Sequence, residues 1–230
     1  MVSAFLPQAS TFAGDIDFVI NLILASVLPF FLASQFCIFY FCWKFRAKEG
    51  GKAQYITGEE SHETKWVTYP HFLVLGFDVL SIFFAVQVWY NVKQQLPEAD
   101  RTVRVVGSQW AWTFVHPGPD GELDTRDDIE LNDELHLEEG VVYHYQLQSN
   151  DVIHSFSIPA FRLKQDAVPG RTITGWFEPN LVGEYDFQCA EMCGVGHGIM
   201  VAKAYVHDAA GHKAWLAEHS GVASLTPTAN

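Results

Sequence analysis

The sequence predicts a membrane-anchored all-β fold, in which a two-helix transmembrane hairpin is followed by a β-sandwich or barrel. Two long stretches almost free of charge predict the hairpin, and short alternating segments after Pro97 predict the strands. The composition is 49% hydrophobic, 14% aromatic and 18% charged, which is too apolar for a disordered chain and too interrupted for a polytopic transporter. We therefore expect one folded domain held at a membrane.

The first predicted span covers 18–43, a stretch of 26 residues without a charge. As a helix it would measure about 39 Å, at roughly 1.5 Å per residue, against a hydrocarbon core of about 30 Å. The second span covers 66–92, whose one charge is Asp78. Trp and Tyr residues near the ends of these stretches are typical of a membrane interface. Pro29 and Pro70 are expected to kink or start their helices.

Basic residues indicate how the hairpin is oriented. The segment before residue 18 contains no Lys or Arg, so it does not look like a cleavable signal peptide. The loop between the spans carries five basic residues, which are Lys44, Arg46, Lys48, Lys52 and Lys65. The positive-inside rule places this loop on the cytoplasmic or matrix side, so both termini and the following domain lie on the external face.

Alternating polar and apolar segments follow Pro97, and turn-forming residues separate them. The predicted strands are 101–106, 110–115, 141–147, 155–158, 171–177, 183–189 and 201–206. Their number and spacing indicate an all-β sandwich or barrel. Asp208 can cap a short helix through Glu218, and the Ser/Thr/Pro/Ala tail beyond it is expected to fray. The expected divisions are the membrane segment 1–97, the β-domain 98–207 and the helix with its tail 208–230.

Charge narrows the choice of partners. The net charge is −13, and residues 98–230 carry 8 basic and 20 acidic side chains. We do not expect nucleic acid to bind, because so acidic a domain repels phosphate. A basic protein or a cation would instead be attracted.

The most informative stretch is Cys189-Ala-Glu-Met-Cys193-Gly-Val-Gly-His197-Gly-Ile-Met200, with His154 upstream. Two His, one Cys and a weak Met ligand are typical of copper electron-transfer sites. The additional Cys189 changes the stoichiometry, because two thiolates can bridge two copper ions, each of which then takes one imidazole. A structural zinc site of two Cys and two His is the main alternative, although zinc has no use for Met200. A disulfide is a further alternative.

These features resemble subunit II of a haem–copper cytochrome c oxidase over nearly the whole chain. Two N-terminal spans, an external cupredoxin-like domain and the pattern Cys-x-Glu-x-Cys-x3-His-x2-Met characterise that family, and each motif position is filled here. His154 lies 35 residues before Cys189, as the family requires, and segment 163–171 between them is also similar. The resemblance implies that the β-domain is cupredoxin-like.

The resemblance also implies the ligands of a binuclear copper centre, CuA. They are His154, Cys189, Cys193, His197, Met200 and the backbone carbonyl of Glu191. The two cysteines would bridge both copper ions. His154 and Met200 would complete one ion, while His197 and the Glu191 carbonyl would complete the other. The Glu191 side chain is similar to the one that binds a magnesium ion at the boundary with the catalytic subunit.

The segment Gln109-Trp-Ala-Trp112 resembles the aromatic patch through which cytochrome c delivers its electron. Trp110 would receive the electron and Trp112 would extend the docking patch, although Ala111 replaces an aromatic residue between them. Alternatively, Trp110 and Trp112 form one strand face packed into the core, since residues two apart share a face. Asp151 is the one docking acid that the resemblance carries over, because the stretch after Trp112 is shorter than usual in the family.

Before the second span, Glu63-Thr-Lys-Trp-Val-Thr-Tyr-Pro70 matches the family pattern Glu-x-x-Trp-x-x-x-Pro. The resemblance places Glu63 at the mouth of a proton path, on the inner side of the membrane. The alternative is that Glu63 is one more solvated acid in the cluster 59–63.

The resemblance implies that the chain takes electrons from cytochrome c or a similar basic donor. It would pass them to haem in catalytic subunit I, where oxygen is reduced to water and protons are translocated. Other oxidase subunits are further expected partners, in a bacterial plasma membrane rather than a mitochondrial inner membrane. The alternatives are a membrane-anchored copper-binding or copper-delivery protein, against which the presence of only three Met argues, and a CuA subunit of a nitric oxide-reducing relative.

Overall fold

The computed structural model describes residues 2–52 and 55–223. It divides into two compact units, one covering Asp17–Trp89 and the other containing the described residues on both sides of that range. Most of the C-terminal tail that was expected to fray lies outside the described residues, which end at residue 223.

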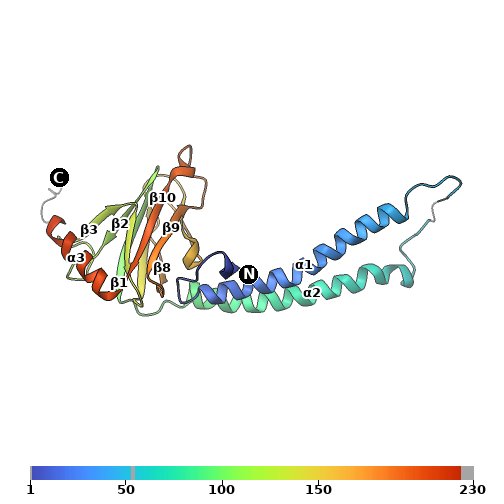
Figure 1. The fold of residues 1–230 in the computed structure, drawn as a ribbon, viewed down its shortest axis with the longest axis horizontal. Helices are drawn as coiled ribbons and strands as arrows, with labels where there is room; N and C mark the ends of the chain where they lie inside the picture. Colours follow the sequence, from blue (N-terminus) through green and yellow to red (C-terminus); the bar gives the residue numbers. More distant parts are fainter. Residues whose placement is uncertain (1, 53–54, 224–230) are drawn as a thin grey trace. The chain divides into compact units, whose positions relative to one another are not determined.

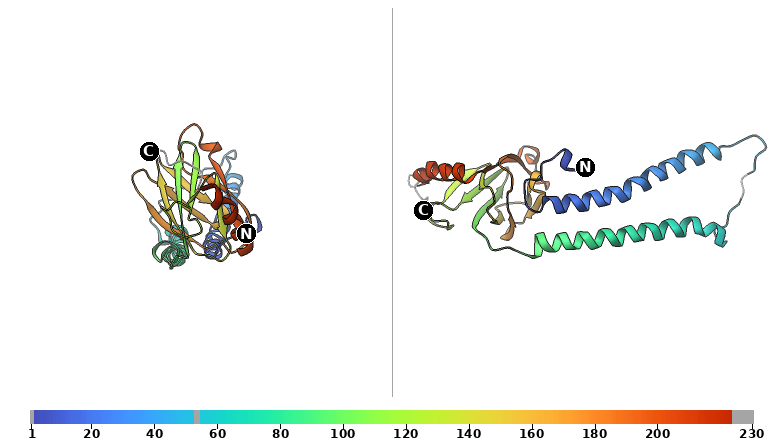
Figure 2. Two further views of the ribbon diagram at one scale, coloured as in Figure 1. Left: turned by 90° about the vertical axis from the view of Figure 1, so that its left-hand side faces the viewer. Right: turned by 60° about the horizontal axis from the view of Figure 1, so that its bottom comes forward.

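Two long apolar helices account for the hairpin. They are α1 (Ala13–Lys44) and α2 (Ser61–Trp89), and a single π-helical turn, η2 (Tyr90–Gln94), continues α2. Both helices are long and apolar enough to cross a membrane. They run side by side, with edge-to-face ring contacts at Phe18–Phe84 and Phe30–Phe77 (Figures 1 and 2). The predicted spans therefore form two helices, and Pro29 and Pro70 lie inside them.

The β-domain is a sandwich of two five-stranded sheets (Figure 1). The first sheet has the strand order β3-β2-β1-β5-β8 and the second has the order β4-β10-β9-β6-β7. The strands are β1 (Arg101–Ser108), β2 (Ala111–His116), β3 (Ile129–Asn132), β4 (Glu134–Glu138), β5 (Tyr143–Ser149), β6 (His154–Ile158), β7 (Leu163–Ala167), β8 (Ile173–Phe177), β9 (Gly183–Cys189) and β10 (Val201–His207). All seven predicted strands form, with ends shifted by no more than two residues.

Alternating side chains from both sheets build the core. β1 buries Val103 and Val105, β5 buries every second residue from Tyr143, and each intervening side chain stays partly exposed. Aromatic rings join the two sheets, as where Phe114 of β2 meets Phe187 of β9 edge to face at 5.4 Å. Burial of this apolar surface stabilises the sandwich and fixes the ends of its strands.

Three strands were not predicted: β3, β4 and β7. β3 belongs to the first sheet and β4 to the second, and Asp133 alone separates them. Asp133 has a positive φ of 60°, which aspartate tolerates better than most residues, and its carboxylate accepts the backbone N–H of Trp112 at 2.9 Å. The chain thus changes sheets at one residue.

Two further segments lie against the sandwich. At the N-terminal side, Ala9 donates its N–H to the Ala160 carbonyl at 3.0 Å, and Ser10 Oγ donates to the Phe161 carbonyl at 2.8 Å. At the C-terminal side, helix α3 (Ala209–Ala223) contacts β3, β4 and β10 (Figure 1). Asp208 caps α3 as predicted, since its carboxylate accepts the Gly211 N–H at 2.7 Å.

Candidate metal centre

The predicted ligands come from neighbouring strands of the second sheet. His154 is the first residue of β6, Cys189 is the last residue of β9, and the loop between β9 and β10 supplies the others. Cys189 donates its N–H to the Met200 carbonyl at 3.0 Å, which closes this loop. β6 pairs with β9, so His154 is brought to Cys189 although 35 residues separate them in sequence.

The structure brings all six predicted ligands together. Cys189 Sγ and Cys193 Sγ are 3.8 Å apart. Each thiol has an imidazole beside it, His154 Nδ1 at 4.0 Å from Cys189 Sγ and His197 Nδ1 at 3.6 Å from Cys193 Sγ. The remaining donors are Met200 Sδ, 3.8 Å from Cys193 Sγ, and the Glu191 carbonyl oxygen, 3.3 Å from Cys189 Sγ.

These distances fit metal ligation. A tetrahedral ion bound to sulfur at about 2.3 Å holds two sulfur ligands about 3.8 Å apart. The ligand atoms of His154, Cys189 and Cys193 all lie within 4.8 Å of one another, and all three residues are buried. With His197, Met200 and the Glu191 carbonyl, the set offers six donors, which is more than one tetrahedral ion can use.

The protonation of the Cys193 thiol determines what metal binding would require. Burial and the neighbouring thiol of Cys189 raise the pKa of Cys193 to about 11, so that Cys193 is protonated at neutral pH in the absence of a positive charge. Because a metal binds the thiolate, metal binding here must release a proton.

Trp110 lies directly beside the ligand loop. Its indole Nε1–H donates to the Cys193 carbonyl at 3.2 Å, and 40% of the residue is exposed. The indole rests on the loop backbone at Gly196, where an added Cβ would come within 2.4 Å of the ring. A surface tryptophan is therefore joined to a predicted ligand through one hydrogen bond.

The structure corrects the docking role expected of Trp112. This residue is 0% exposed and meets Phe187 edge to face at 4.9 Å between the two sheets. β2 begins only at Ala111, so Trp110 precedes the strand and does not share its buried face. The core placement considered for both tryptophans therefore holds for Trp112 alone.

The carboxylates of Glu191 and Glu63 occupy different settings. Glu191 is partly buried in the ligand loop, where its backbone carbonyl faces Cys189. Glu63 lies in the first turn of α2, and its carboxylate accepts the Gly58 N–H at 2.8 Å. The Glu63 side chain is 18% exposed, so it is not freely solvated.

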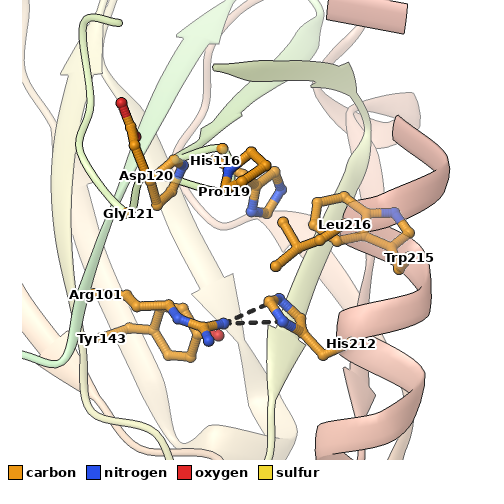
Figure 3. A pocket seen from close by; sticks show the side chains of 11 residues that line it. Arg101, His116, Pro119, Asp120, Gly121, Tyr143, His212, Trp215 and Leu216 are labelled. Carbon is orange, nitrogen blue, oxygen red and sulfur yellow. Dashed lines mark hydrogen bonds between the residues drawn. The ribbon is translucent and has the colours of Figure 1, made fainter. Parts of the chain in front are cut away.

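Sequence reasoning missed a second group of histidines, beneath α3. His116, His136 and His212 are buried. Arg101 Nη1 donates to His212 Nδ1 at 2.9 Å, at the wall of a cavity of about 170 Å³ (Figure 3). Burial lowers the pKa of His116 to about 3 and that of His212 to about 4. Only the pairing of α3 with the sheets reveals this group, since its members are scattered in sequence.

Several known proteins are similar to this chain in sequence. Residues 101–205 match the family described as cytochrome C oxidase subunit II, periplasmic domain. The chain is 32% identical to the alternative cytochrome c oxidase subunit 2 of Bradyrhizobium diazoefficiens, over 93% of this chain and 83% of that protein. It is 28% identical to cytochrome c oxidase subunit 2 of Cereibacter sphaeroides, over 95% of this chain and 80% of that protein.

The fold is shared as well. The crystal structure of the periplasmic domain of subunit II of cytochrome oxidase from Bradyrhizobium japonicum is similar, with a TM-score of 0.50 and 27% identity, over 56% of this chain and 99% of that chain. Together with the two apolar helices, this likeness confirms the predicted fold class of a membrane hairpin and a cupredoxin-like domain. The chain thus belongs to the cytochrome c oxidase subunit II family and is a subunit of a haem–copper terminal oxidase, an oxidoreductase complex of respiratory electron transport.

Proposed function

We propose that this chain is the electron-accepting subunit of the oxidase. It takes electrons from cytochrome c or a similar basic donor and passes them to haem in catalytic subunit I, where oxygen is reduced to water and protons are translocated. The observation that carries the proposal is the 3.8 Å between the thiols of Cys189 and Cys193, with an imidazole beside each. Two bridging thiolates suit a pair of copper ions, which would accept and release one electron at a time.

The donor set supports copper over zinc. Met200 is buried with its sulfur 3.8 Å from Cys193 Sγ, and a thioether is a ligand that suits copper. We assign His154 and Met200 to one ion. We assign His197 and the Glu191 carbonyl to the other. The Glu191 carboxylate would bind magnesium at the boundary with the catalytic subunit.

Burial of the ligands argues against a copper-delivery protein. Cys189, Cys193, Met200 and His154 are all buried, whereas a protein that hands its metal to another must expose its ligands. Buried ligands would retain the metal ions while electrons pass through the centre. No feature of the described residues favours nitric oxide over oxygen as the final acceptor.

The basic loop of the hairpin supports a direction for electron transfer. The basic loop between α1 and α2 supports an inner, cytoplasmic position for that loop, which leaves the copper-binding domain on the periplasmic side of a bacterial membrane. The bacterial relatives agree with this location. Electrons would therefore be taken from a donor outside the membrane and delivered to the haem of subunit I.

Glu63 is proposed to stand at the inner mouth of a proton path. Its carboxylate is held by the Gly58 N–H at 2.8 Å, at the start of the helix that crosses the membrane, and this fixed position supports the proposal. Glu63→Gln combined with Glu60→Gln should slow haem reduction steps that need proton uptake, while copper content stays unchanged. Wild-type turnover by the intact double variant would instead favour a solvated acidic cluster.

Electron uptake is the test of the proposed function. Trp110→Ala should slow reduction of the assembled oxidase by cytochrome c in a rapid-mixing experiment, with the dissociation constant of the donor almost unchanged. Trp215→Phe, at the α3 end of the domain, is the matched control and should react at the wild-type rate. If Trp110→Ala also reacts at the wild-type rate, Trp110 does not receive the electron.

The same experiment should depend on salt. The region 98–230 carries 20 acids against 8 bases and would steer a basic donor toward it. Added salt shortens the reach of this attraction to about 8 Å at physiological ionic strength, so the association rate should fall as salt rises. A rate independent of salt would exclude a basic donor.

A further inference from the structure

The carboxylate of Asp151 is the hub of a hydrogen-bond network beside the thiols. Asp151 lies in the turn between β5 and β6, where its side chain is partly exposed. Its Oδ1 accepts the Nε2–H of His154 at 2.7 Å and the N–H of Val152 at 2.6 Å. Its Oδ2 accepts the N–H of Gln109 at 2.6 Å. Three of the roughly four acceptor positions of the carboxylate are therefore in use.

One of these hydrogen bonds determines how His154 is presented. Because Nε2 carries the proton given to Asp151, Nδ1 has a free lone pair, and Nδ1 is the atom that faces Cys189 Sγ. The ring is enclosed on its other sides by Trp112, at 5.8 Å between centroids, and by Gly107, where an added Cβ would come within 3.0 Å of it. Asp151 thus supplies the polar contact that fixes the orientation of a fully enclosed ring.

The second oxygen fixes the segment that carries Trp110. With its N–H held by Asp151, Gln109 directs its side-chain Nε2–H to the Cys193 carbonyl at 2.8 Å. The following residue, Trp110, donates to the same carbonyl at 3.2 Å. The side chains of Gln109 and Trp110 therefore both bind the Cys193 carbonyl, and the turn between β1 and β2 that carries them is held by Asp151.

We infer that Asp151 is a positioning residue, which holds His154 and the Gln109–Trp110 pair in fixed orientations around the thiols. This inference rests on the proposed function, since it assigns a role toward the bound copper. A carboxylate that holds a ligand histidine fixes the tautomer of that histidine and raises its basicity.

Replacing Asp151 should therefore have different effects from removing a surface charge. In Asp151→Asn, an amide NH2 replaces one oxygen, so at least one of the three N–H donors loses its acceptor. Copper affinity should fall by about 10- to 100-fold, as is typical when the partner of a ligand histidine is lost. The reduction potential should rise, because a less basic imidazole and a lost negative charge both disfavour the oxidised centre.

The experiment uses the full-length chain in detergent, loaded with copper, and the oxidase assembled with it. Asp151→Asn and Asp151→Glu are compared with Asp186→Asn. Asp186 is a suitable control because its side chain is 84% exposed and pairs with Lys203 on the strand surface. Copper content, the absorption and electron paramagnetic resonance spectra and the reduction potential are measured, together with the KM for cytochrome c over a range of salt.

We expect both Asp151 variants to change the spectra and the potential, while Asp186→Asn changes neither. Glutamate restores the negative charge, but its side chain is one methylene longer and cannot reproduce the hydrogen-bond geometry. Asp151→Glu should therefore not restore the wild-type spectrum. The inference is overturned if the Asn variant only raises KM at low salt and the Glu variant restores KM. Failure of the wild-type chain to bind two copper ions would instead contradict the proposed function.

Discussion

The β-domain buries histidines in two regions whose surroundings differ. Around the ligand loop, His154 and His197 face the thiols of Cys189 and Cys193. Beneath α3, the buried imidazoles face aromatic rings and one another. His136 stacks on Trp215 at 4.6 Å between centroids, and its Nδ1 meets His207 Nε2 at 2.9 Å.

The comparison separates a metal site from a packing site. Among the described residues, a group of three potential metal ligands converges only at the ligand loop. The imidazoles under α3 are close together, but His136 lies flat on Trp215 while His116 meets Trp215 edge to face, and no three of their ring nitrogens converge among the described residues. Burial of histidine alone therefore says little about function, and the direction in which the donor atoms point decides it.

The largest expected effect is the loss of the copper centre. Cys189→Ser and Cys193→Ser should each abolish it, because each thiolate is proposed to bridge both ions. His136→Phe, in the region beneath α3, should keep the full copper content. Metal analysis and absorption spectra of the full-length variants check this, and a serine variant with wild-type copper would show that its thiol does not bridge.

Truncation of the buried tryptophan should cost stability. Trp112→Ala should lower the free energy of unfolding by about 3–5 kcal/mol, the usual cost of removing a large buried aromatic side chain. Trp110→Ala should cost clearly less, because the Trp110 side chain is partly exposed. Denaturant unfolding of both variants gives the two values. Trp112→Ala with wild-type stability and a raised KM for cytochrome c would restore the docking role.

Acidic pH should lower the stability of the β-domain because of the buried histidines beneath α3. Burial lowers the pKa of His116 to about 3 and those of His136 and His212 to about 4, whereas an unfolded histidine titrates near 6.5. The unfolded chain therefore binds more protons as pH falls below about 6.5, and stability that is complete above this pH is lost toward pH 4.

The dependence of the unfolding free energy on pH can be measured. Each histidine that stays neutral in the folded state contributes roughly 1.4 kcal/mol per pH unit between its two pKa values. His136→Phe keeps a ring against Trp215 and removes one titrating group, so the unfolding free energy should fall less steeply with decreasing pH, by about that amount, between pH 6.5 and 4.5. An unchanged slope would show that His136 is protonated in the folded domain.

The smallest effect expected at the metal is that of Met200→Leu. A thioether is a weak ligand that adjusts the redox potential, so the variant should retain copper and shift its potential. Leucine also fills a similar volume, which limits the packing cost. Voltammetry of the copper-loaded chain measures the shift. Loss of copper in this variant would make Met200 an essential ligand.

Sequence predicted the ligand loop well because its signal is local. Five of the six ligands fall within Cys189–Met200, and the spacing of these residues sets the chemistry before any fold is known. His154 could be added because it lies 35 residues before Cys189, as in the family that the sequence resembles, and because segment 163–171 between them is also similar. By contrast, the hydrogen bonds of Asp151 and the enclosure by Gly107 depend on how β1, β6 and their turns meet, which the local sequence does not encode.

The missed strands and the group beneath α3 have related causes. β7 is short, mostly polar and at a sheet edge, and β3 is followed by a change of sheet at Asp133, so their alternation is weak. The histidines under α3 come from β2, β4, β10 and the helix itself, and no spacing links them. Side chains that meet only through tertiary packing leave no periodic signal.

The central claim is that the two thiols hold a pair of copper ions in one electronic unit. Metal analysis and electron paramagnetic resonance of the copper-loaded full-length chain test it most directly. The account predicts two copper ions per chain, with one unpaired electron in the oxidised centre that is shared equally by both copper nuclei. A single copper with a localised signal, or zinc bound in place of copper, would contradict it.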